Sequence, residues 1–478
     1  MFLYRAADRA IGVVSTLLLA RLLSPADFGL VAMATAVIAM VELATAFGFD
    51  VALIQTRDPS PAHYNTAWTL NILLGIGGCA LVAALSWPMA TFFSEPRLVV
   101  VMLLLGLALF IQGFENIGIV DFRRTMNFEK EFRFLAAKRL AGFVVTLVIA
   151  LLLKSYIALL LGTVAARAVG LVLSYSMQPR RPRFSLTHAH ELIHFSKWTL
   201  IGNAIIAGLQ RAPHFLVGRM LGAGSLGLYV VAADIGGLPT TELAAPINRA
   251  AIPGYASLIH DRHELRRTFE DISGVVALLA LPAGVGLACV AASAVAVLLG
   301  EKWVGAVPVV QLLALSGAFV ATASNNGAVC VATGKPRLNT LMLALRLIVL
   351  GLLLFLLVPR FGMQGAAWAE LLGAAASFMF SWAIAIRVLD LPGITPLRIY
   401  WRPGIAVLGM WGVLHACDAY WMSGLPRDSI LALLLRVLLG CTTFGAVITL
   451  LWIAASRPEG PESQLLRRAR RALGMQET

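Results

Sequence analysis

The 478-residue sequence predicts an all-α, polytopic membrane protein. Hydrophobic residues make up 59% of the chain and charged residues only 13%, which is too little charge to cover the surface of a soluble protein. Apolar runs of roughly 20 residues recur along the whole length, as expected for helices that cross a bilayer. These observations exclude soluble enzymes, nucleic-acid binders and secreted scaffolds. The net charge of +13 is expected to orient the chain in a membrane.

Reading the apolar runs between polar breaks gives about 14 transmembrane helices. In chain order they cover residues 2–23, 28–49, 67–90, 98–119, 134–153, 156–176, 198–220, 225–247, 272–298, 308–332, 338–358, 362–386, 402–422 and 429–453. Each run is long enough for a helix to cross a hydrocarbon core of about 30 Å. We do not expect the first to be a cleaved signal peptide, because Arg5, Asp8 and Arg9 interrupt its start and the apolar run continues to Leu23.

The basic residues are distributed unevenly between the two sets of connecting segments. With a cytoplasmic N-terminus, the inner segments hold 27 of the 38 lysines and arginines, and the outer segments hold 7. Because cytoplasmic loops carry the excess of basic residues, this bias predicts that both termini are cytoplasmic. The basic tail at 456–478 is expected to lie on anionic lipid.

An internal repeat divides the chain. The segment LLARLLSPADFGLV, residues 18–31, matches LVGRMLGAGSLGLY, residues 216–229, at a constant offset. Arg21 is equivalent to Arg219, and Gly29 to Gly227. Six spans separate the copies, so both have the same orientation, and an axis along the membrane normal should relate the two halves. We expect two parallel six-helix lobes, 1–180 and 181–390, and an extra C-terminal helix pair, 391–455.

The stretch ARLLSPADFGLVAMATAVIAMVELATAFGFDVALIQ, residues 20–55, together with GRMLGAGSLGLY in the second half, resembles the polysaccharide transporter (oligosaccharide flippase) family of the multidrug, oligosaccharidyl-lipid and polysaccharide exporter superfamily. The resemblance implies a multi-pass protein of the bacterial inner membrane. It also implies that the protein flips undecaprenyl-diphosphate-linked oligosaccharide repeat units for O-antigen, capsule or exopolysaccharide assembly. Membrane lipids, a polysaccharide polymerase and export machinery would be its partners.

Three arginines lie near the middle of predicted spans: Arg167, Arg211 and Arg346. Charges at membrane depth are costly and therefore tend to be functional. The guanidinium fork matches phosphate oxygens, so we expect these side chains to bind the substrate diphosphate. The alternative is that each arginine pairs with a nearby acid, such as Asp234 or Glu370, and holds helices together.

Two further sets of polar residues are candidate substrate contacts. Arg5 and Arg9 share one face of the first span, where they either receive the diphosphate or anchor the helix at the cytoplasmic surface. Asn203, Gln210 and His214 share a face of span 7, and a polar stripe of this kind is expected to face a cavity or a helix contact rather than lipid.

Three acidic residues are candidates for ion coupling: Glu42 in span 2, and Asp234 and Glu242 in span 8. Gly236, Gly237 and Pro239 can break span 8 and free backbone carbonyls beside a carboxylate. The arrangement would suit a coupling proton or sodium ion. Neutralisation of the arginines is the alternative role. No other cofactor is expected.

Two rival functions follow from other features of the sequence. A cation-coupled multidrug exporter of the same superfamily would need a cavity dominated by carboxylates and aromatic rings. The HExxH motif, residues 190–194, is typical of a zinc metalloprotease. It lies in an amphipathic segment before span 7 without an obvious third ligand, which favours an interfacial helix and no bound metal. The sequence therefore predicts a transporter rather than an enzyme.

Overall fold

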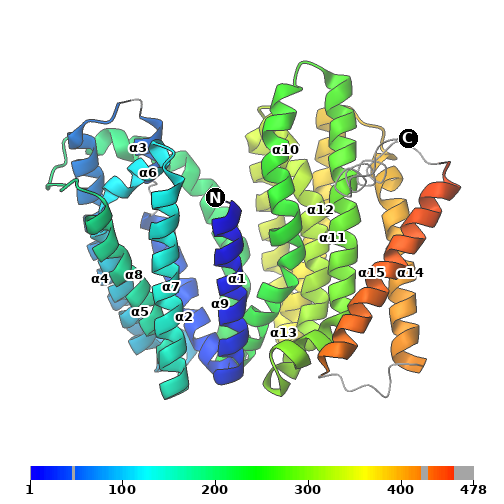
Figure 1. Cartoon of the computed structure of the whole chain (residues 1–478), viewed down its shortest axis with the longest axis horizontal. Coiled ribbons are helices and arrows are strands. Elements are labelled where there is room, and N and C mark those ends of the chain that lie inside the picture. Colours follow the sequence, from blue (N-terminus) through cyan, green and yellow to red (C-terminus); the bar gives the residue numbers. More distant parts are fainter. Residues whose placement is uncertain (1, 46–48, 57, 421–428, 457–478) are drawn as a thin grey trace. The chain divides into compact units, whose positions relative to one another are not determined.

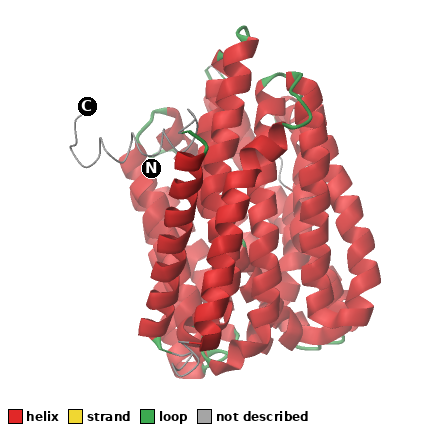
Figure 2. Ribbon diagram, turned by 90° about the vertical axis from the view of Figure 1, so that its right-hand side faces the viewer, coloured by secondary structure: helices red, strands yellow, loops and turns green. Residues whose placement is uncertain are grey.

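The computed structural model of the chain describes residues 2–45, 49–56, 58–420 and 429–456. Side chains at 2–10, 13, 44–45 and 191–203 are also outside the described set. The described part consists of helices and connecting loops, with no strand, so the all-α prediction is confirmed (Figure 2). The chain folds as two compact units, Met1–Val230 (unit 1) and Val231–Thr478 (unit 2), shown in Figure 1. The predicted lobes, 1–180 and 181–390, stay a prediction.

Unit 1 contains α1 (Phe2–Leu22), α2 (Pro25–Thr45), α3 (Phe49–Gln55), α4 (Pro61–Phe93), α5 (Leu98–Gly113), the short helix η1 (Ile117–Ile119), α6 (Val120–Arg124), α7 (Phe128–Leu153), α8 (Ile157–Met177) and most of α9 (Ala189–Gly236). Unit 2 contains η2 (Pro239–Ala244), α10 (Ala245–Ser257), α11 (Arg262–Leu298), η3 (Glu301–Ala306), α12 (Val307–Ala332), α13 (Pro336–Leu389), α14 (Thr395–Tyr420) and α15 (Ile430–Ala454).

Helices cover at least part of each of the fourteen predicted spans. Among the described residues, nine helical stretches are apolar and long enough to cross a membrane, and the bent pair α5 and η1–α6 makes ten. Two of the stretches hold 54 residues, about 80 Å of helix, which is more than twice the hydrocarbon thickness. Each is broken at a glycine with positive φ, Gly222 (78°) or Gly362 (59°), and so forms two spans. Helices α1 and α14 cover the remaining two.

The predicted span 98–119 is wrong at its second half. Helix α5 ends at Gly113, and the chain bends by 69° before η1 and α6. Asn116 stabilises the bend, because its Oδ1 accepts a hydrogen bond from the backbone N–H of Gly118 and its Nδ2 donates one to the carbonyl of Arg180. The apolar residues after the bend therefore form η1 and α6, at the same end of unit 1 as α3 (Figure 1).

At the predicted break, span 8 departs from α-helical geometry, but the helical stretch runs on to Ser257 and the carbonyls of Ala233 and Gly237 accept backbone hydrogen bonds. Helix α9 ends at Gly236, and one turn of π-helix, η2, follows from Pro239. The break allows close packing on α12: a Cβ at Gly236 would lie 2.7 Å from the Cβ of Leu313, and one at Gly317 would lie 2.5 Å from the carbonyl oxygen of Gly236. The Thr240 hydroxyl donates to the carbonyl of Gly317 across the same contact.

The two copies of the repeat touch each other, and both contacting segments belong to unit 1. A Cβ added at Gly29 would lie 1.7 Å from the carbonyl oxygen of Ala223, and one added at Gly227 would lie 1.7 Å from that of Pro25. At the offset of the repeat, Pro25 is equivalent to Ala223 and Gly29 to Gly227. Gly29 of the first copy therefore contacts Ala223 of the second, and Gly227 of the second contacts Pro25 of the first. A two-fold axis generates reciprocal contacts of this kind.

Within unit 2, a buried arginine holds the added helix pair against α11. Arg436 on α15 is 5% exposed; its Nε lies 2.7 Å from Oδ1 of Asp418 on α14, and its Nη1 donates to the hydroxyl of Ser293 on α11. An arginine at membrane depth needs such partners. The contact fixes α14 and α15 against α11.

Candidate functional site

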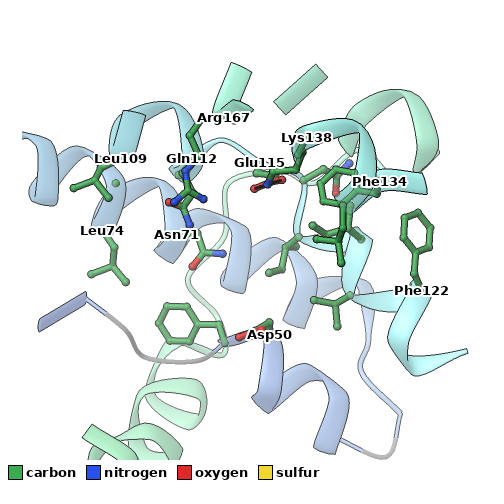
Figure 3. A pocket seen from close by; sticks show the side chains of 18 of the residues that line it. Asp50, Asn71, Leu74, Leu109, Gln112, Glu115, Phe122, Phe134, Lys138 and Arg167 are labelled. Atoms are coloured by element: carbon green, nitrogen blue, oxygen red, sulfur yellow. Dashed lines mark hydrogen bonds and ion pairs between the residues drawn. The ribbon is translucent and has the colours of Figure 1, made fainter. Parts of the chain in front are cut away.

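A cavity of about 620 Å³ lies inside unit 1, within the size range of small-molecule sites (Figure 3). Helices α2, α3, α4, α5, α7 and α8 and the bend after α5 contribute its walls. Seven charged side chains line it: Glu42, Asp50, Glu115, Arg123, Glu131, Lys138 and Arg167. Sequence reasoning singled out two of them, Glu42 and Arg167, and the structure brings these two together.

Glycines form one wall of the cavity. A Cβ at Gly75 on α4 would lie 2.9 Å from Cα of Gly113, the last residue of α5, and a Cβ at Gly113 would lie 2.9 Å from the carbonyl oxygen of Asn71. The two backbones can approach this closely only because both residues lack a side chain. The bend that follows Gly113 then places Glu115 on the cavity wall (Figure 3).

Ion pairs join the charged side chains of the cavity. The Nζ atom of Lys138 lies 2.7 Å from Oε1 of Glu115, and both side chains are less than one fifth exposed. Gly170 on α8 leaves room for this lysine, since a Cβ there would lie 2.6 Å from its Cε. Half-buried pairs of this kind hold helices in place and make the cavity wall polar at little net cost.

Arg123 bridges two acids at the end of the cavity near α6. Its Nε lies 2.6 Å from Oε1 of Glu131 on α7, and its Nη1 lies 3.8 Å from Oδ2 of Asp50 on α3. Glu131 is 4% exposed, and its second oxygen, Oε2, is buried without a hydrogen-bond partner in the described part of the chain. A buried acceptor left without a donor is costly, and such an atom points to a missing partner.

Arg167 and Glu42 form a looser pair on the cavity wall, where Nη2 and Oε1 are 4.0 Å apart. The amide side chains of Asn71 and Gln112 lie on the same part of the wall (Figure 3). Among the described residues, neither amide side chain makes a hydrogen bond. Both are therefore available to a ligand.

The predicted polar stripe of span 7 is divided between two environments. Gln210 on α9 is exposed, whereas His214 is 9% exposed and its Nδ1 has no hydrogen-bond partner within the described segments. The His214 ring meets Tyr229 edge-on at 6.3 Å between centroids. Arg211, one turn before His214, is half-buried and forms no ion pair with any described residue. The side chain of Asn203 lies outside the described residues.

Arg346 is paired with an acid, which is the alternative that the sequence left open. Its Nη2 lies 3.2 Å from Oε2 of Glu370, and the two residues lie on α13 on either side of the break at Gly362. Both side chains are less than one fifth exposed. The pair therefore holds the two spans of α13 together.

The remaining candidates lie elsewhere. Asp234 near the end of α9 and Glu242 in η2 are exposed, and both take part in further interactions. In the HExxH motif, His190 is exposed. The side chains of Arg5, Arg9, Glu191 and His194 lie outside the described residues.

Sequence reasoning did not find the acids at 50, 115 and 131 or the role of Lys138. In the segment FEKEFRF, residues 128–134, only the basic residues enter the sequence-based prediction, as part of the charge count that orients the chain. In this segment Glu129 and Glu131 alternate with basic residues, and this alternation is the sequence signal for ion pairs there. Helical spacing alone does not say that Glu131 turns inward, where it meets Arg123.

Known proteins resemble this chain in sequence and in fold. The model of a family described as "Polysaccharide biosynthesis protein" matches residues 18–308. The lipopolysaccharide biosynthesis protein WzxC of Escherichia coli (strain K12) is 30% identical over 334 residues, 68% of this chain and 67% of that protein. The succinoglycan biosynthesis transport protein ExoT of Rhizobium meliloti (strain 1021) is 24% identical over 91% of this chain and 89% of that protein.

The fold agrees with a solved transporter structure. The lipid II flippase MurJ in an inward closed conformation superimposes with a TM-score of 0.75 at 12% identity, covering 96% of this chain and 100% of that one. The family and the fold are those of membrane transporters, so the metalloprotease alternative is set aside. The chain belongs to the polysaccharide biosynthesis protein family of multi-span membrane transporters, as the hairpin motifs predicted.

Proposed function

We propose that this protein flips undecaprenyl-diphosphate-linked oligosaccharide repeat units from the inner to the outer leaflet of the bacterial inner membrane by alternating access. The product would serve O-antigen, capsule or exopolysaccharide assembly. The relatives support the proposal, because their names place them in lipopolysaccharide biosynthesis and in succinoglycan transport. The likeness of the fold to a lipid II flippase agrees with a substrate that carries a lipid tail and a sugar headgroup.

The charged cavity of unit 1 is the observation that carries the proposal. Of the seven charged side chains around the cavity, Glu42 and Arg167 lie inside apolar spans, where a charge costs about 3 kcal/mol on insertion scales and therefore tends to serve a polar pathway. A sugar headgroup cannot cross hydrocarbon alone and needs hydrogen-bonding walls. The isoprenoid tail can stay in the lipid.

We assign the diphosphate to Arg211, with Arg167 and Arg346 as further contacts that would have to leave their acids to reach it. Arg5 and Arg9 would receive the same group at the cytoplasmic surface, and Asn203, Gln210 and His214 would contact the headgroup. Glu42, Asp234 and Glu242 are the proposed sites of proton or sodium coupling. A polysaccharide polymerase and export machinery would act after this protein, and both chain termini would be cytoplasmic.

Complementation tests this proposal. A strain without the gene should lose surface polysaccharide and accumulate lipid-linked repeat units, and the wild-type gene should restore both. Arg211→Lys should restore little export although the protein is present, because a point charge cannot reproduce the bidentate fork. Unchanged surface polysaccharide in the deletion strain would contradict the proposed function.

One observation favours a multidrug exporter as the second candidate. Carboxylates outnumber bases around the cavity, and Phe49, Phe122 and Phe134 also line it, as a cationic aromatic drug would require. Expression in a drug-sensitive host distinguishes the two. Resistance to cationic dyes without any effect on surface polysaccharide would support the exporter.

A further inference from the structure

The charges around the unit 1 cavity are unfavourable for an anion. Four carboxylates face three basic side chains, and every base already lies within 4.0 Å of a carboxylate oxygen. A diphosphate would therefore enter a site with a surplus negative charge, and it would have to displace an acid from each base that it used. The cavity does not match the anionic part of the proposed substrate.

The unused polar atoms of the cavity match a hydroxyl group. The buried Oε2 of Glu131 needs a donor, and the amides of Asn71 and Gln112 offer donors and acceptors that no described residue uses. A hydroxyl donates one hydrogen bond and accepts others, so a molecule with several hydroxyls can satisfy the carboxylate with one of them and an amide with another. An inorganic cation could satisfy the carboxylate oxygen but not the donors of the amides.

The apolar part of the lining suits the C–H face of a sugar ring. Phe49 and Phe134 are each 3% exposed, and Leu74 and Leu109 line the cavity beside the two amides (Figure 3). Sites for small molecules combine mostly apolar walls with a few placed polar groups. A pyranose ring combines an apolar C–H face with polar hydroxyl groups, so it matches both the apolar walls and the polar groups of the cavity.

We propose that the unit 1 cavity binds an uncharged sugar of the headgroup, with Glu131 as the buried acceptor and Asn71 and Gln112 as the amide contacts. The inference rests on the proposed function, because it names the part of the substrate that this cavity takes. It removes Arg167, which lines the cavity, from the proposed diphosphate contacts and leaves that group to residues outside the cavity.

Protection from alkylation tests the site directly. Leu74→Cys, in a chain whose five cysteines are replaced, puts one thiol on the cavity wall. A water-soluble maleimide is added to purified protein with a methyl hexoside, with inorganic pyrophosphate, or with sodium chloride at the same ionic strength. We expect the hexoside alone to slow labelling. Thr125→Cys, on an exposed residue between α6 and α7, is the matched control and should react equally in all three.

A second substitution tests the named contacts. Asn71→Ala should weaken protection by the hexoside about tenfold, the effect of losing a hydrogen bond in a desolvated site. The rate without sugar should not change. Slowing by pyrophosphate and not by the hexoside, or equal labelling rates in all three solutions, would overturn the proposal.

Export measurements separate this inference from the proposed function. If deletion abolishes export but Asn71→Ala and Glu131→Gln export normally, the sugar site is wrong and the flippase function stands. If deletion leaves export intact, the flippase function is wrong, and the labelling result then decides on the cavity alone.

Discussion

The crossing of the two repeat copies makes a symmetric prediction about stability. In Gly29→Ala the new methyl group would lie 1.7 Å from the carbonyl oxygen of Ala223 and 2.8 Å from the backbone nitrogen of Gly227. In Gly227→Ala it would lie 1.7 Å from the carbonyl oxygen of Pro25. These neighbours are backbone atoms and cannot rotate away, so the two helices must separate. Overpacking usually costs about 1–3 kcal/mol, and a backbone clash of this depth should reach the upper end.

The effects of the two substitutions should be similar and should not add. Once the helices have separated for one methyl group, the second enters the same space, so the double variant should cost clearly less than the sum of the single variants. Thermal unfolding of the purified proteins in one detergent measures this. Wild-type stability of Gly29→Ala, or fully additive losses in the double variant, would refute the reciprocal contact.

Two nearby glycines are matched controls. A Cβ at Gly224 meets nothing within 4 Å, so Gly224→Ala should leave stability unchanged or raise it by about 0.4–1 kcal/mol. Gly222 also has open space but a φ of 78°, so Gly222→Ala should cost about 1–2 kcal/mol through backbone strain alone. The expected loss of stability is largest for Gly29→Ala, smaller for Gly222→Ala and absent for Gly224→Ala. This order distinguishes a steric clash with backbone atoms from strain in the backbone dihedral angles.

Three further predictions concern charged side chains. Arg346→Ala should lower stability by about 3–5 kcal/mol because it leaves the carboxylate of Glu370 buried and unpaired, and adding Glu370→Ala should recover part of the loss in the same unfolding assay. Arg436→Ala should loosen the C-terminal helix pair, so limited proteolysis should cut the chain between α14 and α15 faster than in the wild type. In the loop after α4, the hydrogen bond from Arg97 lowers the pKa of Glu95. This pair therefore stabilises the fold above the ordinary pKa of 4.5, and the stabilisation is lost as the pH falls through the lowered pKa. Glu95→Gln should remove that part of the acid dependence of the melting temperature.

The helices could be predicted from the sequence because hydropathy is a local property. Runs of apolar residues give the fourteen spans, and the glycines at 222 and 362 fall in or beside the predicted turns. The span after Leu98 failed because the residues beyond Gly113 are equally apolar. A side-chain clamp from Asn116 to the carbonyl of Arg180 turns the chain there, and no local pattern reveals a partner so distant in sequence.

The candidate site could be predicted only in part, because its chemistry depends on pairs of residues. Arg167 and Glu42 stood out as charges inside apolar spans, and hydropathy finds such residues. The spacing of Arg346 and Glu370 along the chain does not show that the break at Gly362 brings them together. Glu131 was hidden among basic neighbours, and its unpartnered oxygen is visible only once the helices are packed.

The most direct test of the flippase function is the side of the membrane on which the lipid-linked sugars lie. Spheroplasts of a strain with a repressible copy of the gene are probed with a membrane-impermeant lectin for the repeat unit, and bound lectin is divided by the total lipid-linked repeat extracted from the same cells. If the protein is the flippase, this exposed fraction falls to background as the protein is depleted while the total rises, and the wild-type gene reverses both. An exposed fraction that stays unchanged on depletion would contradict this function.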